Sequence, residues 1–60
     1  MVEILRQFRY PGNAADGRPI TKTYVAGRDD EGRPFLFTFD GELRGDALIL
    51  AVESRLLERA

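Results

Sequence analysis

The sequence contains no cysteine and no histidine, and it has a single serine, Ser54, and a single lysine, Lys22. Histidine is the commonest general base and metal ligand, and cysteine supplies thiolates for catalysis, zinc binding and disulfides. Their absence excludes Ser-His, Cys-His and zinc-histidine sites within the chain. Ser54 stands between Glu53 and Arg55, and nothing nearby in the sequence can activate it as a nucleophile. We therefore expect no catalytic activity, no metal and no cofactor.

Carboxylates are the only abundant groups left for chemistry, and they form two clusters in expected loops. The clusters are Asp29, Asp30 and Glu31, just before Gly32, and Asp40, Glu42 and Asp46. The first cluster lacks the alternating ligand spacing of a calcium-binding loop. Turn and helix-cap roles explain the acids of both clusters, so we predict acidic loops that are available to a partner.

The length of 60 residues predicts one small domain covering residues 1–60. A chain of this length buries only about 60% of the surface that it exposes when unfolded. Homodimerisation or docking onto a larger protein is therefore an expected aid to stability. The N-terminus does not read as a signal peptide, and the longest apolar run, 47–52, is too short to span a bilayer. We expect a cytoplasmic protein with no membrane partner and no small-molecule substrate.

Charge is unevenly distributed, although the net charge is only −1. Residues 1–28 hold five basic and two acidic side chains, whereas residues 29–60 hold four basic and eight acidic ones. This asymmetry indicates a basic patch and an acidic patch on one small body. Eight of the nine basic residues are arginines, which form bidentate contacts with carboxylates and phosphates and are frequent at interfaces.

Three segments have the composition of β-strands. Residues 2–10 alternate imperfectly between apolar and polar side chains, with a short helix as the competing interpretation. Residues 20–26 are rich in threonine, tyrosine and valine, and residues 35–39 carry three phenylalanines that point to one face. The prolines and glycines of residues 11–19 predict a long loop, either a binding element or a connector. Residues 27–34 predict a turn.

Asp46 is the predicted N-cap of a helix that runs from Ala47 to about Arg59, with a fourth strand at 48–52 as the rival interpretation. The predicted fold class is α+β. It consists of a three-stranded antiparallel sheet packed by one C-terminal helix, in two layers and in the order β-β-β-α. The predicted core comprises Val2, Ile4, Phe8, Val25, Phe35, Phe37, Phe39, Ile49, Val52 and Leu56.

Four leucines do not fit this core. Leu50 and Leu57 lie one heptad apart and away from the predicted buried stripe of the helix. Leu5 and Leu36 are expected on the sheet face that points away from the helix. Because contiguous exposed apolar side chains mark interfaces, we expect self-association or partner docking through one of these patches.

Nucleic-acid binding is a second possible use of the sheet face. If Lys22 and Tyr24 share that face with Gln7 and Arg9, and Arg28 flanks it, the face is basic and carries an aromatic ring. In element order, the chain resembles the small DNA-binding domains at the N-termini of some phage and transposon integrases, and plant AP2 domains. That resemblance implies DNA reading by strands. The acidic second half opposes this use, because affinity for DNA comes largely from neutralising phosphates.

We expect a small non-enzymatic binding or regulatory protein that acts through protein–protein contacts. In size and composition, the chain resembles the compact inhibitors that phages and mobile elements encode, including anti-CRISPR proteins. This resemblance implies that the acidic loops block a basic or nucleic-acid-binding site on a target protein. The alternatives are the DNA-binding module described above and a structural subunit of a larger assembly.

Overall fold

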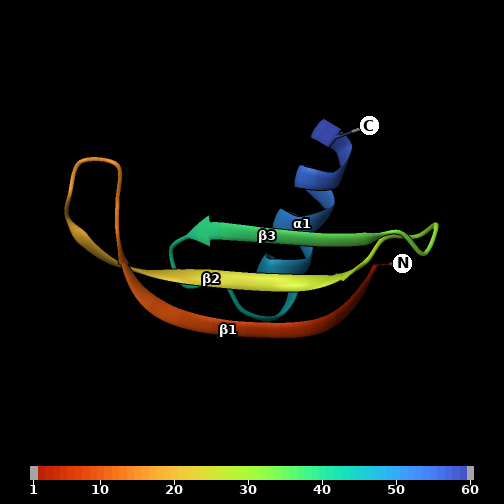
Figure 1. The fold of residues 1–60 in the computed structure, drawn as a ribbon, viewed down its shortest axis with the longest axis horizontal. Helices are drawn as coiled ribbons and strands as arrows, with labels where there is room; N and C mark the ends of the chain where they lie inside the picture. Colours follow the sequence, from red (N-terminus) through yellow and green to blue (C-terminus); the bar gives the residue numbers. More distant parts are fainter. Residues whose placement is uncertain (1, 60) are drawn as a thin grey trace.

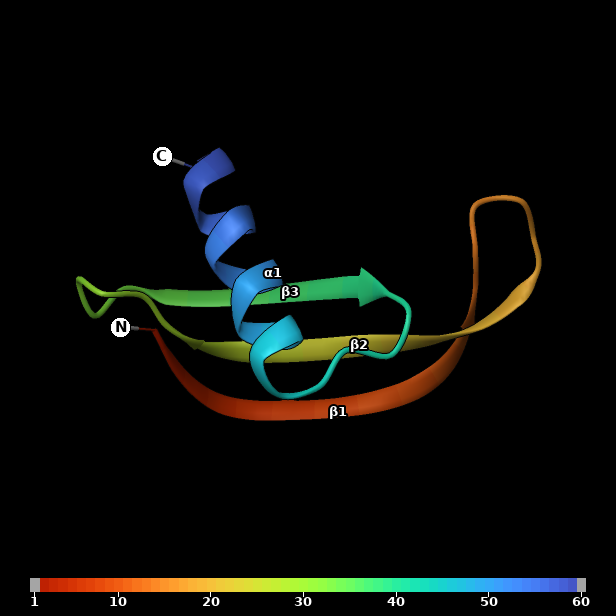
Figure 2. The ribbon, with the colours of Figure 1, turned by 180° about the vertical axis from the view of Figure 1, so that it is seen from behind.

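The computed structural model describes residues 2–59 as three strands followed by one helix (Figure 1). The elements are β1 (Glu3–Asn13), β2 (Pro19–Arg28), β3 (Pro34–Asp40) and α1 (Gly45–Arg59). The strands form one antiparallel sheet in the order β1-β2-β3, and α1 crosses one face of it (Figure 2). The predicted β-β-β-α fold is confirmed, and the rival fourth strand at 48–52 is wrong because these residues are helical. Among residues 2–59, no helix has the length and apolar character needed to cross a membrane.

The core lies between the sheet and α1. Its buried hydrophobic side chains are Val25, Phe35, Leu48 and Val52. Partly buried apolar side chains that pack against them are Val2, Ile4, Phe37, Phe39, Leu43 and Leu56. The three phenylalanines of β3 therefore face a common interior, as predicted. Burial of this apolar surface is the main driving force for the fold.

A β-bulge in β1 determines which of its side chains face α1. Ile4 pairs with Gly27, but Arg6 already pairs with Ala26, so Leu5 is an extra residue in the ladder. Side chains alternate along a strand, and one extra residue moves every later side chain to the other face of the sheet. The residues of β1 after the bulge therefore point opposite to where unbroken alternation from Ile4 would place them.

Two members of the predicted core are wrong. The bulge places Phe8 on the face away from α1, where its side chain is 46% exposed. On α1, Ile49 is 38% exposed, and Leu48 is buried in its place. Both positions lie three or four residues before Val52, so helical spacing alone fits either one.

The long loop predicted for residues 11–19 is also wrong. β1 continues to Asn13 and β2 begins at Pro19, so only residues 14–18 form the turn. The main-chain N–H of Ala14 donates to the carbonyl oxygen of Arg18 at 2.8 Å and closes it. Pro11 is tolerated because β1 is an edge strand. Its outer side pairs with no other strand, so a proline that lacks an N–H costs no hydrogen bond there. The predicted turn between β2 and β3 is confirmed, with Gly32 at a φ of 81°.

A buried threonine attaches the segment between β3 and α1 to the sheet. The hydroxyl of Thr23 donates to the carbonyl oxygen of Gly41 at 2.8 Å and accepts from the main-chain N–H of Leu43 at 3.0 Å. The guanidinium of Arg9 donates to the carbonyl oxygen of Leu43, with its Nε at 3.1 Å. These bonds fix the approach to α1 relative to β1 and β2.

The far end of α1 is held as well. Nη2 of Arg59 lies 3.3 Å from the carboxylate of Asp29 in the turn between β2 and β3. The guanidinium of Arg55 lies 4.7 Å from the ring centroid of Phe39 and 5.5 Å from that of Phe37, which is cation–π geometry. The helix is therefore connected to the sheet or its turns at both ends.

Gly27 is the position where the bulge leaves no room for a side chain. A Cβ there would lie 1.9 Å from the carbonyl oxygen of Glu3, whereas a Cβ at Gly12 would meet only the side chain of Lys22, at 2.8 Å. We expect Gly27→Ala to destabilise the fold by about 2–3 kcal/mol, or to abolish cooperative unfolding, because backbone must move. Gly12→Ala should cost less than about 1 kcal/mol. Urea unfolding compares them, and equal stability would contradict the close packing at the bulge.

Thr23→Val removes the hydroxyl that serves Gly41 and Leu43 while keeping the β-branched shape. We expect a loss of about 1–3 kcal/mol in the free energy of unfolding, because a buried N–H and C=O lose their partner. Thr38→Val on exposed β3 surface is the matched control and should change stability by less than about 0.5 kcal/mol. A neutral Thr23→Val in the same urea titration would show that these bonds do not anchor the segment.

Candidate functional site

The open face is the side of the sheet that points away from α1. Antiparallel register and the alternation of side chains define its members. Over the three-stranded part of the sheet they are Glu3, Arg6, Phe8 and Tyr10 of β1, Lys22, Tyr24, Ala26 and Arg28 of β2, and Pro34, Leu36, Thr38 and Asp40 of β3. Leu5, the extra residue of the bulge, adjoins them. No other element of residues 2–59 covers this side of the sheet (Figure 1).

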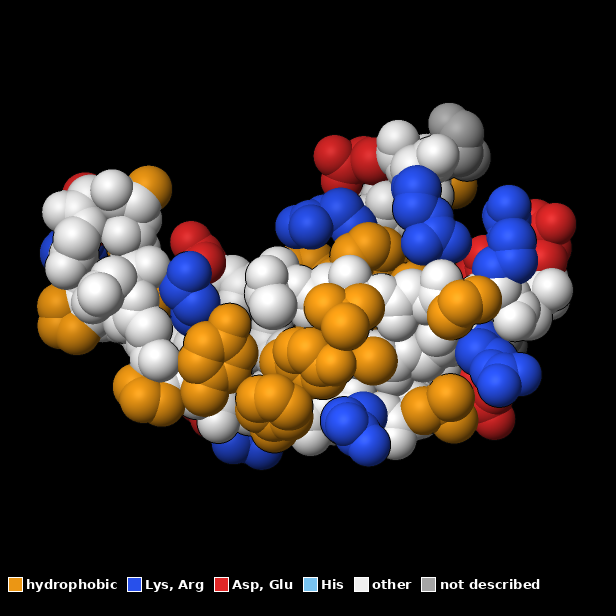
Figure 3. Space-filling view, in the orientation of Figure 1, with side chains coloured by type: hydrophobic (Ala, Val, Ile, Leu, Met, Phe, Trp, Pro, Cys, Tyr) orange, Lys and Arg blue, Asp and Glu red, His pale blue; other side chains and the backbone are white. Residues whose placement is uncertain are grey.

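The centre of the open face is apolar and accessible to solvent. Leu5 is 60% exposed, Leu36 is 59% exposed and Phe8 is 46% exposed, while Tyr10 and Tyr24 are half-buried. Figure 3 shows hydrophobic side chains gathered over the middle of the sheet on this side, with basic side chains around them. The molecule therefore presents an aromatic and aliphatic surface to water across three strands.

The aromatic rings of the open face pack against one another. The centroids of Phe8 and Tyr24 are 4.5 Å apart with planes 19° apart, and the centroids of Phe8 and Tyr10 are 5.9 Å apart. Phe8 and Tyr24 are direct partners on neighbouring strands, which are about 5 Å apart. Two rings stacked across that spacing turn their faces to each other and their edges outward. They form a hydrophobic ridge and leave few free faces on which a base could stack.

Three cations surround this apolar centre, and they differ in their pairing. Nζ of Lys22 lies 3.5 Å from the carboxylate of Asp40 on the neighbouring strand. Arg6 and Arg28 have no hydrogen-bond or ion-pair partner for their guanidinium groups among residues 2–59. Arg28 stands across from Glu3 in the register, but no ion pair joins the two side chains. The open face thus has two arginines whose charge is neutralised only by solvent.

The predicted nucleic-acid face is only partly present. Lys22 and Tyr24 do share the open face, as expected, and Arg28, expected in a flanking loop, is the last residue of β2 and belongs to the face as well. The prediction for Arg9 and Gln7 is wrong, because the bulge turns both side chains to the helix side of the sheet. Arg9 is committed there to the carbonyl oxygen of Leu43.

The two acidic loops lie at opposite ends of β3 and are largely neutralised within the chain. Asp29 and Glu31 each lie 3.2 Å from Arg33, and Asp29 also contacts Arg59. At the other end, Glu42 lies 2.6 Å from Arg44, in addition to the Lys22–Asp40 pair. Asp30 also takes part in an interaction. The acids therefore present much less free charge than the sequence indicates.

Asp46 does not occupy its predicted position ahead of the helix. The helix begins at Gly45, so Asp46 lies inside the first turn of α1. A carboxylate in this turn still complements the positive end of the helix dipole. The residue has a local role in α1 that is independent of any partner.

The predicted apolar interface is divided between two sides of the molecule. Leu5 and Leu36 belong to the open face and its margin, as predicted. Leu50 and Leu57 lie on α1 and are 66% and 77% exposed. Leu36 shares its side of the sheet with the stacked rings of Phe8 and Tyr24, and Leu50 and Leu57 do not.

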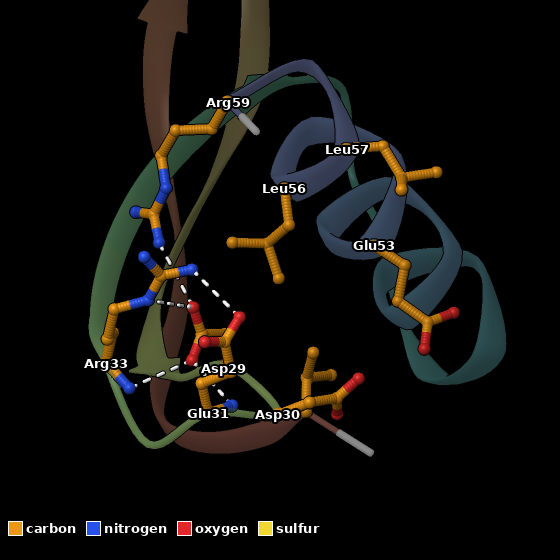
Figure 4. Close-up of a pocket in the computed structure, with 9 residues that line it drawn as sticks. Asp29, Asp30, Glu31, Arg33, Glu53, Leu56, Leu57 and Arg59 are labelled. Atoms are coloured by element: carbon orange, nitrogen blue, oxygen red, sulfur yellow. Dashed lines mark hydrogen bonds and ion pairs between the residues drawn. The ribbon is translucent and has the colours of Figure 1, made fainter.

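A groove of about 650 Å³ separates the turn between β2 and β3 from the second half of α1 (Figure 4). Leu56 points into it, and Arg33 and Arg59 converge on Asp29 at one wall. Within residues 2–59, no three acidic side chains are grouped as a metal ion would need. The charges of this wall hold the turn against the helix.

Sequence reasoning missed Arg6, Phe8 and Tyr10 as members of the candidate site. Their assignment to the open face depends on the bulge at Leu5. The available signal was Gly27, because a glycine inside a strand often marks a bulge or a close approach of backbone.

Compared with known proteins, the chain matches no family model, no curated protein and no solved structure. The functional interpretation therefore depends on the chemistry of its own surface.

Asp29 should make stability depend on pH. Main-chain N–H groups of Arg33 and Glu31 both donate to its Oδ1 at 2.9 Å. The Arg33 N–H lowers the pKa of Asp29 below its ordinary value of 3.8, with further lowering from the Glu31 N–H and the Arg33 charge, against partial desolvation. A depressed pKa contributes stability that is present above 3.8 and is lost as pH falls through the folded-state value.

We expect Asp29→Asn to be less stable than wild type near about pH 7, and the difference to shrink as the pH falls below 3.8 and the wild-type carboxyl takes up a proton. Urea midpoints measured across this range test the sign. A difference that grows as pH falls would contradict the role assigned to the Asp29 carboxylate.

Proposed function

We propose that the chain is a small non-enzymatic protein-binding module that contacts another protein through its open face. The observation that carries this proposal is the exposed apolar surface of Phe8, Tyr24 and Leu36, which share one side of the sheet across all three strands, with Leu5 at its margin. Contiguous apolar surface that a folded monomer exposes often serves as an interface. Covering it releases about 25 cal/mol per Å² of apolar area, which supplies free energy for binding.

The composition of the open face supports a protein partner. Interface centres are enriched in tyrosine, phenylalanine and arginine, and binding energy concentrates in such anchors. Phe8, Tyr10 and Tyr24 form the aromatic ridge, and Arg6 and Arg28 stand beside it. A standard interface buries about 800 Å² per partner. That is nearly a fifth of the 4323 Å² of accessible surface of this small molecule.

A protein partner fits these residues better than a nucleic acid does. Base reading needs hydrogen-bonding side chains at the centre of the contact, but Phe8, Ala26 and Leu36 offer none. Affinity for a duplex rises with the number of phosphates neutralised, and this face has few cations with which to neutralise them. A compact body with one contact face acts by covering a surface of its partner, which is a suitable action for a regulator or an inhibitor.

Site-specific photocrosslinking tests the proposal. A benzophenone amino acid is placed at Phe8 or, as the control, at Leu50 on α1, in cells that naturally make the protein. We expect one discrete protein adduct from position 8 and none of the same mass from position 50. Adducts with nucleic acid, or with a second copy of this chain, would refute the proposal that the open face binds a different protein.

The crosslinked protein is then purified and its affinity for two matched variants is measured. Leu36→Asp places a charge in the open face, and Leu50→Asp places one on α1 at similar exposure. We expect Leu36→Asp to weaken binding at least about tenfold, or about 1.4 kcal/mol, and Leu50→Asp to leave it unchanged. The opposite order of effects would assign the interface to the helix.

A further inference from the structure

We propose that the partner presents an apolar patch bordered by carboxylates, and that these carboxylates pair with Arg6 and Arg28. This inference rests on the proposed function and specifies the chemistry of the surface that the open face receives. Three observations support it: the pairing of the other basic side chains within the chain, the position of Arg6 and Arg28 on the open face, and the small side chain of Ala26 beside them.

Seven of the nine basic side chains already have partners within residues 2–59. Arg9 donates to a main-chain carbonyl oxygen, and the other six lie within 4.0 Å of a carboxylate; these are Arg18, Lys22, Arg33, Arg44, Arg55 and Arg59. Arg6 and Arg28 are the exceptions, and both belong to the open face. The chain has ten acidic and nine basic side chains, yet these two arginines remain unpaired within residues 2–59, and they share one side of the sheet.

The two arginines stand beside the shortest side chain of the open face. Ala26 pairs with Arg6 on β1 and with Leu36 on β3, and Arg28 follows two positions later on the same side of β2. An alanine among long side chains leaves room for an apolar side chain from a partner. A partner residue seated over Ala26 would have a guanidinium on two sides, so carboxylates next to it would come within pairing distance.

Charge argues against the open face of a second copy as the occupant. The ionisable side chains of Arg6, Lys22 and Arg28 outnumber the carboxylates of Glu3 and Asp40. Two such faces docked together would bring unpaired guanidinium groups into one contact, and like charges at an interface cost affinity. A partner with acidic side chains around an apolar patch removes that repulsion and adds charge-assisted hydrogen bonds.

A displayed library of random peptides is the probe. It is selected on the immobilised full chain and counter-selected on the Leu36→Asp variant. We expect the selected peptides to combine large apolar residues with nearby aspartate or glutamate. The Arg6→Glu/Arg28→Glu double variant should bind them about tenfold or more weakly, because two favourable charge pairs become repulsive. Replacing the acids of a peptide by lysine should restore binding to the double variant.

The matched control is Arg18→Glu/Arg44→Glu, which changes the net charge equally at two turns outside the open face. It should keep wild-type affinity. Two outcomes would overturn the proposal of an acidic partner: loss of affinity in this control, or selection of peptides that lack acidic residues. Either outcome would leave the proposed function standing. Failure to select any peptide that depends on Leu36 would overturn both. A dimer in sedimentation that Leu36→Asp dissociates would assign the open face to a second copy.

Discussion

The close contact between Gly27 and the backbone of Glu3 is the constraint on which the surface of this protein depends. It accompanies the bulge at Leu5, and the bulge sets the direction of every later side chain of β1. Without it, Phe8 would enter the core and Arg9 would join the open face. With it, Phe8 meets Tyr24 in solvent, and Arg9 is available to hold the segment before α1. A single inserted residue thus produces both the candidate site and an anchor of the helix.

The elements could be predicted from the sequence because their signals are local. Three phenylalanines at alternate positions of β3, threonine and valine in β2, and a run of helix-forming residues at the C-terminus each favour one structure. The extent of β1 could not be predicted, because Pro11 and Gly12 usually break strands and only pairing with β2 keeps them extended. Leu48 and Ile49 could not be separated by helical spacing, since each suits the stripe through Val52.

The sequence predicts part of the candidate site, because alternation along β2 and β3 is a local signal. Leu36, Lys22 and Tyr24 lie on strands whose alternation is unbroken, so their common face follows from the sequence, whereas Arg28 joins it only because β2 extends into the predicted turn. The acidic loops were identified as exposed charge, yet Asp29 and Glu42 are paired with arginines brought close by the turns. Which charges remain without a partner is a property of the folded chain. The arginines that matter for the proposal were recognisable only once those pairs were known.

The attachment of α1 at both ends has a mechanical consequence for the sheet beneath it. Thr23 and Arg9 secure its beginning, and the Arg59–Asp29 pair secures its end. A helix held at two points resists displacement from the strands that it crosses, β2 and β3 (Figure 2). The opposite surface would then have little freedom to lose if a partner docked there, and the proposed association would carry a small conformational-entropy penalty. The helix, although it lies on the side away from the partner, would in this way help to set the affinity.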